Sequence, residues 1–275
     1  MTEPNQAHDQ VHDEVAGFYA KALVRNSCCG SNCGTSTAES IGYQASDTSE
    51  IPDDAMANSF GCGNPVAFSG VHEGDVVVDL GSGAGIDVIM AGQKVGATGH
   101  VIGVDMTGDM IDRARANIAA AGLANAEIRQ GLIEHMPVDD DSVDWVISNC
   151  VINLSPDKPA VFAEIARVLK PGGQMLVSDI VVEDLPQWVR ADKALYSACV
   201  AGAVSESAYL AGLRAACLVD VEIRDRLDYD TSQITAMYRG EWGGEEATDE
   251  SVARAAMEAT GKVSSISVYA RRPEG

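Results

Sequence analysis

A short glycine-rich segment constrains the fold of this chain more than any other feature. Residues 79–85 have the sequence Asp-Leu-Gly-Ser-Gly-Ala-Gly and follow directly on the apolar run Val76–Val78. Glycine lets the backbone turn tightly and approach a ligand closely, and a glycine-rich turn between a buried strand and a helix binds ligands in open α/β sheets. We therefore expect a strand to end here, a helix to follow, and a small molecule to bind beside the turn.

From residue 75 onward the chain alternates between apolar strands and amphipathic helices. Strands are predicted at 76–78, 101–104, 126–130, 143–148, 174–182, 218–224 and 264–270, and helices at 85–95, 108–121 and 156–169. Ser155 is expected to cap the last of these helices, and Pro171-Gly172-Gly173 to end it. Apolar strands without polar interruptions, alternating with helices, indicate a parallel, Rossmann-like α/β sheet with helices on both faces.

Two segments lie outside this alternation. Residues 1–65 are predicted to form an N-terminal extension with a helix at 8–26, a cysteine-rich turn at 28–34 and a lid or linker at 35–54. Residues 66–275 are predicted to form the main domain, in which 184–216 is expected to be a helical cap inserted before the last strands. His8 and His12 share one face of the first predicted helix, but no third ligand accompanies them, so both are expected at the surface.

The charge of the chain excludes some partners. Its formal net charge is -22 at pH 7, which would repel the phosphates of nucleic acids and of anionic membranes. The first residues include His, Asp and Glu where a signal peptide would need a basic start and an apolar run. No apolar stretch approaches the ~20 residues that span a bilayer. These features predict a cytoplasmic protein with no nucleic-acid or membrane partner.

The chain has seven cysteines. In a reducing compartment, cysteines more often bind metals, catalyse or pack in a core than form a disulfide framework. Three of them have informative positions: Cys62 lies between two glycines, Cys150 follows a predicted strand, and Cys199 lies in the predicted cap. Cys217 lies at an alanine-rich helix end and is expected to pack in the core.

The glycine spacing favours S-adenosylmethionine over a nicotinamide cofactor. The loop has the spacing GxGxG rather than the dinucleotide spacing GxGxxG, and Asp79 at its head suits a ligand with an amino group better than a pyrophosphate. Asp105 ends the second predicted strand about 20 residues beyond Gly85, where a carboxylate can accept hydrogen bonds from two ribose hydroxyls. These residues predict a methyltransferase.

Longer motifs narrow the prediction further. They are Gly61–Pro65, Asp79–Gly85, Val104–Thr107, Asn149–Lys158 and Leu169–Gly173. On these motifs the chain resembles the bacterial arsenite S-adenosylmethionine methyltransferases, a family of the class I methyltransferase superfamily. The likeness covers roughly residues 60–225, and it is most specific in Gly61–Pro65 and Asn149–Lys158.

The resemblance implies which residues contact the cofactor. They are Asp79, Gly81, Gly83, Gly85, Asp105, Met106, Ile133, Glu134 and Asn149. Asp79 would lie near the ammonium, Asp105 would take the ribose hydroxyls, and Met106 would stack on the adenine. Many members of the superfamily have an acid that meets the adenine amine where this chain has Leu132. Either Glu134 takes over that contact or the contact is absent.

The resemblance also implies trivalent arsenic, bound by Cys62, Cys150 and Cys199, as the methyl acceptor. Trivalent arsenic is a soft centre that binds three thiolates and keeps a lone pair at the apex, and soft ligands select soft centres. Turnover would need a thiol reductant such as glutathione or thioredoxin. The cluster of Cys28, Cys29 and Cys33 could bind a metal, relay disulfides or pass arsenic inward. In the family, an N-terminal cysteine usually pairs with the counterpart of Cys62, and the sequence does not choose which of the three would do so.

Two other functions stay open at this point. One is methyl transfer to a small organic acceptor of the quinone or sterol-precursor type, which would need an apolar pocket and no cysteines. The other is a non-catalytic protein that binds arsenic or a metal on a methyltransferase fold. The intact loop at Asp79–Gly85 and the presence of Asp105 argue against the second.

Overall fold

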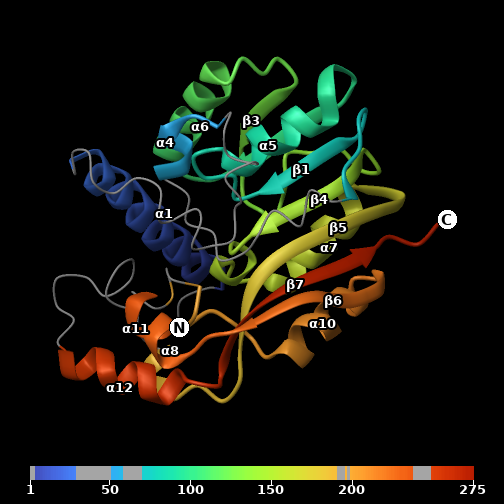
Figure 1. Cartoon of the computed structure of the whole chain (residues 1–275). Coiled ribbons are helices and arrows are strands. Elements are labelled where there is room, and N and C mark those ends of the chain that lie inside the picture. The colour runs from blue at the N-terminus through green and yellow to red at the C-terminus, as the bar shows by residue number, and fades with distance from the viewer. Residues whose placement is uncertain (1–3, 29–50, 58–69, 191–195, 197–198, 238–248) are drawn as a thin grey trace.

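The computed structural model describes residues 4–28, 51–57, 70–190, 196, 199–237 and 249–275. Its centre is a seven-stranded sheet with the order β3-β2-β1-β4-β5-β7-β6 (Figure 1). The strands are β1 (Val76–Leu80), β2 (His100–Asp105), β3 (Ala126–Gln130), β4 (Val143–Asn149), β5 (Leu169–Val182), β6 (Val219–Asp228) and β7 (Val263–Arg271). These positions confirm the strands expected from the sequence.

The sheet is mixed, which corrects the expectation of a parallel sheet. Strands β1 to β5 are parallel to one another, whereas β7 lies antiparallel between β5 and β6. Its register pairs Gln174 with Arg271 at one end and Val182 with Val263 at the other. The apolar pattern of β7 is that of any buried strand, so it carries no information on strand direction.

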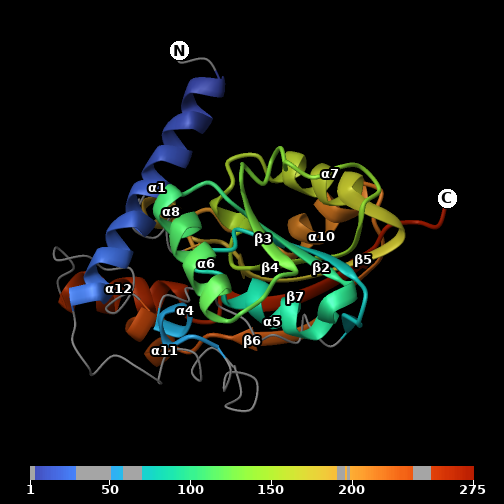
Figure 2. The same cartoon turned by 90° about the horizontal axis from the view of Figure 1, so that it is seen from above.

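Helices cover both faces of the sheet. The helices are α1 (Pro4–Cys28), α4 (Asp53–Ala57), α5 (Ile86–Val95), α6 (Gly108–Ala120), α7 (Lys158–Val168), α8 (Gln187–Arg190), α10 (Glu206–Ala215), α11 (Thr231–Met237) and α12 (Asp249–Ala259). Helices α7 and α10 lie on one face and α5 on the other (Figure 2). Helices α11 and α12 were not expected from the sequence.

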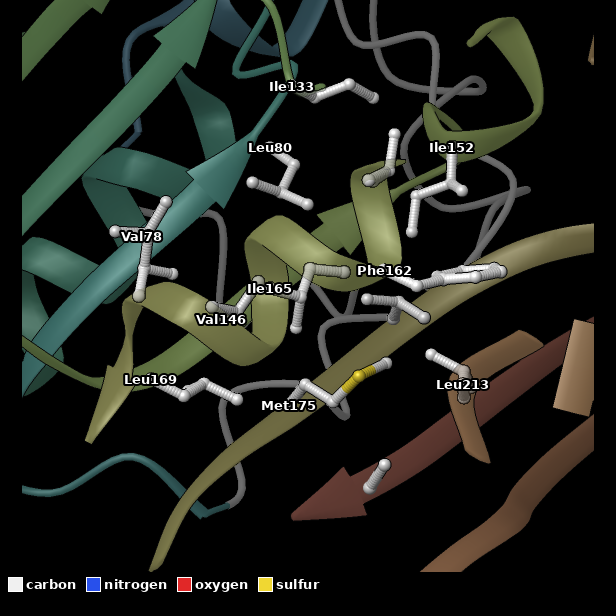
Figure 3. Packing of buried hydrophobic residues seen from close by; sticks show 14 of the residues in the cluster. Val78, Leu80, Ile133, Val146, Ile152, Phe162, Ile165, Leu169, Met175 and Leu213 are labelled. Carbon is white, nitrogen blue, oxygen red and sulfur yellow. The ribbon is translucent and has the colours of Figure 1, made fainter. Parts of the chain in front are cut away.

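Alternating strand residues join the sheet to these two helical layers. Val78 and Val146 pack with Phe162 and Ile165 of α7 (Figure 3), whereas Val77 packs with α5 and α6. The two-residue period of a strand sends adjacent side chains to opposite faces. Each face of the sheet therefore has its own apolar core, and the loops at the strand ends stand on a rigid base.

The start of α7 differs from the expectation. Asp157, not Ser155, is the capping residue, because its side chain accepts a hydrogen bond from the amide of Ala160. The hydroxyl of Ser155 instead accepts from the amide of Asp157 at 3.0 Å and donates to Glu134 at 2.5 Å. Ser155 is therefore free of the helix and is oriented by the loop that follows β3.

The segment expected as a cap divides into two parts. Helix α10 packs on the sheet layer, since Tyr209 and Leu213 are fully buried in the same cluster as α7. Val189, Cys199 and Val200 instead join a second cluster with Val15 of α1. In the described part of the chain, no helix has both the length and the apolarity needed to cross a membrane.

Candidate active site

The glycine loop between β1 and α5 has the backbone geometry that only glycine adopts easily. Gly81, Gly83 and Gly85 have φ angles of 64°, 50° and 89°. A Cβ atom on Gly81 would overlap the side chain of Val151, and one on Gly85 would lie 3.2 Å from that of Ala114. A Cβ on Gly83 would meet nothing within 4 Å, so Gly83 is the glycine that leaves room for a ligand.

Asp105, at the end of β2, holds this loop in place. Its Oδ2 accepts a hydrogen bond from the amide of Gly83 at 2.9 Å, and its Oδ1 accepts from the amide of Thr107 at 2.8 Å. Burial raises the pKa of the Asp105 carboxyl, although these hydrogen bonds oppose the shift. Asp105 therefore shapes the loop in addition to facing the pocket beside it.

A pocket opens where β1, β2 and β4 end, and α1 forms one of its walls. Its lining residues are His12, Val15, Tyr19, Gly81, Ser82, Gly83, Ala84, Ile86, Asp87, Asp105, Met106, Thr107, Met110, Gly131, Leu132, Ile133, Glu134, Asn149, Cys150, Val151, Leu154 and Ser155. Most of the expected cofactor residues are among them. Asp79 and Gly85 are not, because both are buried.

The pocket concentrates negative charge at its glycine loop. The pKa of the buried Asp79 carboxyl is raised well above its usual value, first by desolvation and then by the charges of Asp87 and Asp105. No lysine or arginine occurs among the described residues that line the pocket. Such a site suits a cationic ligand and opposes a pyrophosphate, so it fits S-adenosylmethionine better than a nicotinamide dinucleotide.

Two of the predicted arsenic ligands meet at this pocket. Cys150 lines it, and the thiol of Cys199 donates a hydrogen bond to the carbonyl oxygen of Cys150 at 2.7 Å. Each residue is 4% exposed, and each has a φ of 62°. A left-handed conformation costs a non-glycine residue roughly 1–3 kcal/mol and tends to occur at functional sites.

The remaining cysteines have different positions. Cys62, Cys29 and Cys33 lie outside the described residues, as does the side chain of Cys28. Cys150 is disulfide-bonded, whereas the Cys199 thiol is hydrogen-bonded to the Cys150 carbonyl and Cys217 is a free cysteine. Within the described residues, no group of three His, Cys, Asp or Glu side chains is arranged to hold a metal ion.

The prediction for Cys217 was wrong. Cys217 is exposed and has a φ of 66° just after α10. The amides of Cys217 and Leu218 donate to the carbonyls of Arg214 and Leu213, which is the bonding of a left-handed helix end. This turn directs the thiol outward, and Leu218 takes the buried position.

A buried polar junction supports the turn that carries Cys150. The Asn153 amide donates to Asp179 Oδ1 at 2.7 Å and to the Ile180 carbonyl at 2.6 Å. The Tyr209 hydroxyl donates to Asp179 Oδ2 at 3.3 Å. Desolvation raises the pKa of Asp179 to about 7, against the opposing effects of these hydrogen bonds and of Lys158. The turn is therefore bonded to the end of β5.

The segment that carries Cys199 is fastened to the same turn. The Tyr196 hydroxyl donates to the Leu154 carbonyl at 3.2 Å, and a Cβ on Gly202 would overlap the carbonyl oxygen of Asn153. Lys158 donates to the carbonyls of Ser155 at 3.1 Å and Asn153 at 3.3 Å. These contacts fix the two cysteine-bearing segments against each other.

Helix α1 contributes residues that the sequence analysis did not assign to a site. His12, expected at the surface, lines the pocket, and its Nε2 donates to Glu134 Oε1 at 3.0 Å. Val15 and Tyr19 line the pocket from the same helix. Their four-residue spacing was visible as an amphipathic pattern, but the pattern did not show what the apolar face covers.

Comparisons with known proteins agree with this site. A family model described as a methyltransferase domain matches residues 71–239. The arsenite methyltransferase of Halobacterium salinarum is 43% identical over 233 residues, which are 84% of this chain and 58% of that protein. The demethylmenaquinone methyltransferase of Listeria monocytogenes is 34% identical over 118 residues, which are 43% of this chain and 50% of that protein.

A solved structure gives the same result. The X-ray crystal structure of an arsenic(III) S-adenosylmethionine methyltransferase from Chlamydomonas reinhardtii is 34% identical, with a TM-score of 0.69, and the match covers 84% of this chain and 73% of that chain. The chain spans somewhat more than half the length of the curated arsenite methyltransferases that it matches. Sequence, fold and pocket agree that this chain belongs to the methyltransferase-domain family and, within it, to the arsenite S-adenosylmethionine methyltransferases.

Proposed function

We propose that this chain transfers a methyl group from S-adenosylmethionine to trivalent arsenic bound by cysteine thiolates. The observation that carries the proposal is the position of Cys150. It lines the cofactor pocket, and the thiol of Cys199 contacts its backbone. A methyltransferase for a small organic acceptor would have no need of two buried cysteines beside its cofactor pocket.

The pocket residues have distinct roles in this proposal. S-adenosylmethionine supplies an electrophilic methyl group when it is bound. Each carboxylate oxygen of Asp105 already accepts one backbone hydrogen bond, from Gly83 or Thr107, and would use its other lone pair to accept a hydrogen bond from a ribose hydroxyl. Met106 and Ile133 would contact the adenine. The carboxylates of Asp79 and Asp87 would attract the ammonium group, since opposite charges favour the charged form of both partners.

Cys150, Cys199 and Cys62 would displace the exchangeable ligands of arsenite and hold the arsenic as a trithiolate. The arsenic lone pair would then face the pocket that Cys150 lines. The protein contributes mainly by positioning, and holding two reactants in near-attack geometry supplies roughly 7–11 kcal/mol of the barrier. The rigid bonding around Asn153 and Asp179 is consistent with such a role.

A thiol reductant belongs to the same proposal. Methylation formally oxidises the arsenic by two electrons, so further turnover needs a donor such as glutathione or thioredoxin. Cys150 must also be a free thiol to bind arsenic, and it is disulfide-bonded in this structure. This requirement fits a protein that works in the reducing cytoplasm.

The direct test incubates the pure protein with methyl-labelled S-adenosylmethionine, glutathione and arsenite, and then separates the arsenic species. We expect labelled methylarsenicals, and none when glutathione is omitted. Label that appears only on an added quinol would assign the chain to organic acceptors. Arsenic retained by the protein without any label would instead indicate a binding protein.

We expect cofactor affinity to rise with pH because of the buried Asp79. Burial and the charges of Asp87 and Asp105 raise the pKa of this carboxyl in the empty pocket, and a cationic ligand would lower that pKa, so that its binding is linked to proton release. The affinity should therefore weaken as the pH falls through the raised pKa of the empty pocket. Calorimetry in two buffers of different ionisation enthalpy measures the released proton. Asp79→Asn should abolish the release, whereas Asp109→Asn, on an exposed part of α6, should leave it unchanged.

A further inference from the structure

Helix α1 closes over both the cofactor pocket and the cysteine pair. Val15 is 2% exposed and belongs to the same apolar cluster as Cys150, Leu154 and Cys199. Tyr19 packs against this cluster and also lines the pocket. Figures 1 and 2 both show α1 beyond the ends of the central strands, where it also contacts α6. A ligand enclosed by this helix cannot leave unless α1 moves or the pocket opens elsewhere.

One polar contact ties α1 to the loop that follows β3. His12 donates to Glu134 Oε1 at 3.0 Å, and the two side chains are only 15% and 13% exposed. The same carboxylate oxygen accepts a hydrogen bond from Ser155 at 2.5 Å. Ser155 in turn lies in the turn that begins at Cys150 and ends at α7. Glu134 therefore links α1 to the segment that carries an arsenic ligand.

The position of Glu134 also bears on how it acts. Burial raises the pKa of Tyr196 to about 12, and the nearby Glu134 and Cys199 add to that rise. Burial lowers the pKa of Lys158, and the charges of Asp179, Cys199 and Glu134 oppose that shift. Glu134 is thus near the cysteine end of the pocket. Its Oε1 already accepts two hydrogen bonds from the protein, which favours a role in holding α1 rather than in recognising the adenine amine.

We propose that His12 and Glu134 are positioning residues that hold α1 closed over the bound cofactor. Val15 and Tyr19 then form the apolar wall that keeps water from the reacting end. The hydrogen bond between His12 and Glu134 slows dissociation of the cofactor and its product, because it must break before α1 can move away. The inference rests on the proposed function only for the identity of the ligand.

The test measures binding of S-adenosylhomocysteine by calorimetry and its dissociation rate by stopped flow, without arsenite. We expect His12→Ala to weaken binding about tenfold, which corresponds to ~1.4 kcal/mol, mainly through faster dissociation. Glu134→Ala should have a similar effect, and the double variant should lose no more than either single one. His12→Gln should recover part of the affinity, since its amide can donate to Glu134. His8→Ala is the matched control, one turn earlier on α1 and outside the pocket lining.

Hydrogen exchange of the ligand-free protein gives a second readout. His12→Ala should raise exchange across residues 8–21 relative to the wild type and to His8→Ala, without changing exchange in β1 and β4. Unchanged affinity and exchange in His12→Ala would overturn the proposal. So would a Glu134→Ala variant that loses affinity while His12→Ala does not, because Glu134 would then contact the ligand itself. Absence of arsenite methylation would refute the proposed function and leave the exchange result intact.

Discussion

Replacing Cys150 or Cys199 with serine is expected to abolish methylation of both arsenite and monomethylarsenite, whereas Cys62→Ser should abolish only the first. Arsenite has three exchangeable positions and needs three thiolates. Monomethylarsenite has one position occupied by carbon, so two thiolates suffice. Cys150 and Cys199 are the pair to keep, because both are buried and a hydrogen bond joins their segments.

The expected loss exceeds about 100-fold in rate, because removing a residue that merely orients a ligand already costs about 10–100-fold. Single-turnover assays with each arsenical and saturating cofactor measure it. Cys217→Ser is the matched control, since Cys217 is an exposed free thiol in the same left-handed conformation, and its rate should equal that of the wild type. Full activity of Cys199→Ser on arsenite would remove Cys199 from the site.

Gly202→Ala is expected to reduce arsenite methylation strongly and to lower stability. A Cβ on Gly202 would overlap the Asn153 carbonyl oxygen, which belongs to the backbone and cannot rotate away. The segment that carries Cys199 would therefore have to move from the turn that carries Cys150. Overpacking of this kind costs about 1–3 kcal/mol, and a displacement of about 1 Å at a reacting site can cost about 100-fold in rate.

Two measurements separate these effects. Thermal unfolding should show a melting temperature lower by several degrees, at about 2–4 °C per kcal/mol for a domain of this size. Cofactor affinity should be unchanged, because Gly202 does not line the pocket. Gly108→Ala is the control, as a Cβ there would meet nothing within 4 Å. Wild-type activity in Gly202→Ala would show that the spacing of the two segments is not critical.

The features that the sequence predicted correctly are local. The glycine loop follows an apolar strand within a few residues, and glycine has few other reasons to occur three times at that spacing. The strands and most of the helices follow from apolar periodicity in the same way. Cys150 could be assigned to the pocket because the carboxyl ends of parallel strands form the binding edge of such sheets. Local sequence patterns were therefore enough to predict most of the fold and one wall of the pocket.

The features that were missed depend on contacts between distant segments. His12 is hydrogen-bonded to Glu134, and Asn153, in the turn after β4, is hydrogen-bonded to Asp179 of β5. Neither partner is marked by periodicity or by a motif. Cys217 was misplaced because a left-handed residue at a helix end points outward, and cysteine gives no sign of that conformation. The sequence could not predict the direction of β7 either, since a buried strand has the same composition whether it is parallel or antiparallel to its neighbours.

The place of β7 in the sheet has a consequence for the order in which the protein folds. This strand lies at residues 263–271 but is inserted between β5 and β6. When β6 has been synthesised, β7, which pairs with both β5 and β6, has not. Until then β6 has no strand to pair with. Ile266 pairs with Asp179, the residue that bonds to Asn153 beneath Cys150. The strand that supports the turn carrying Cys150 therefore gains its second neighbour only when β7 has been synthesised, and a nascent chain stalled before residue 263 should expose strand edges that aggregate or recruit chaperones.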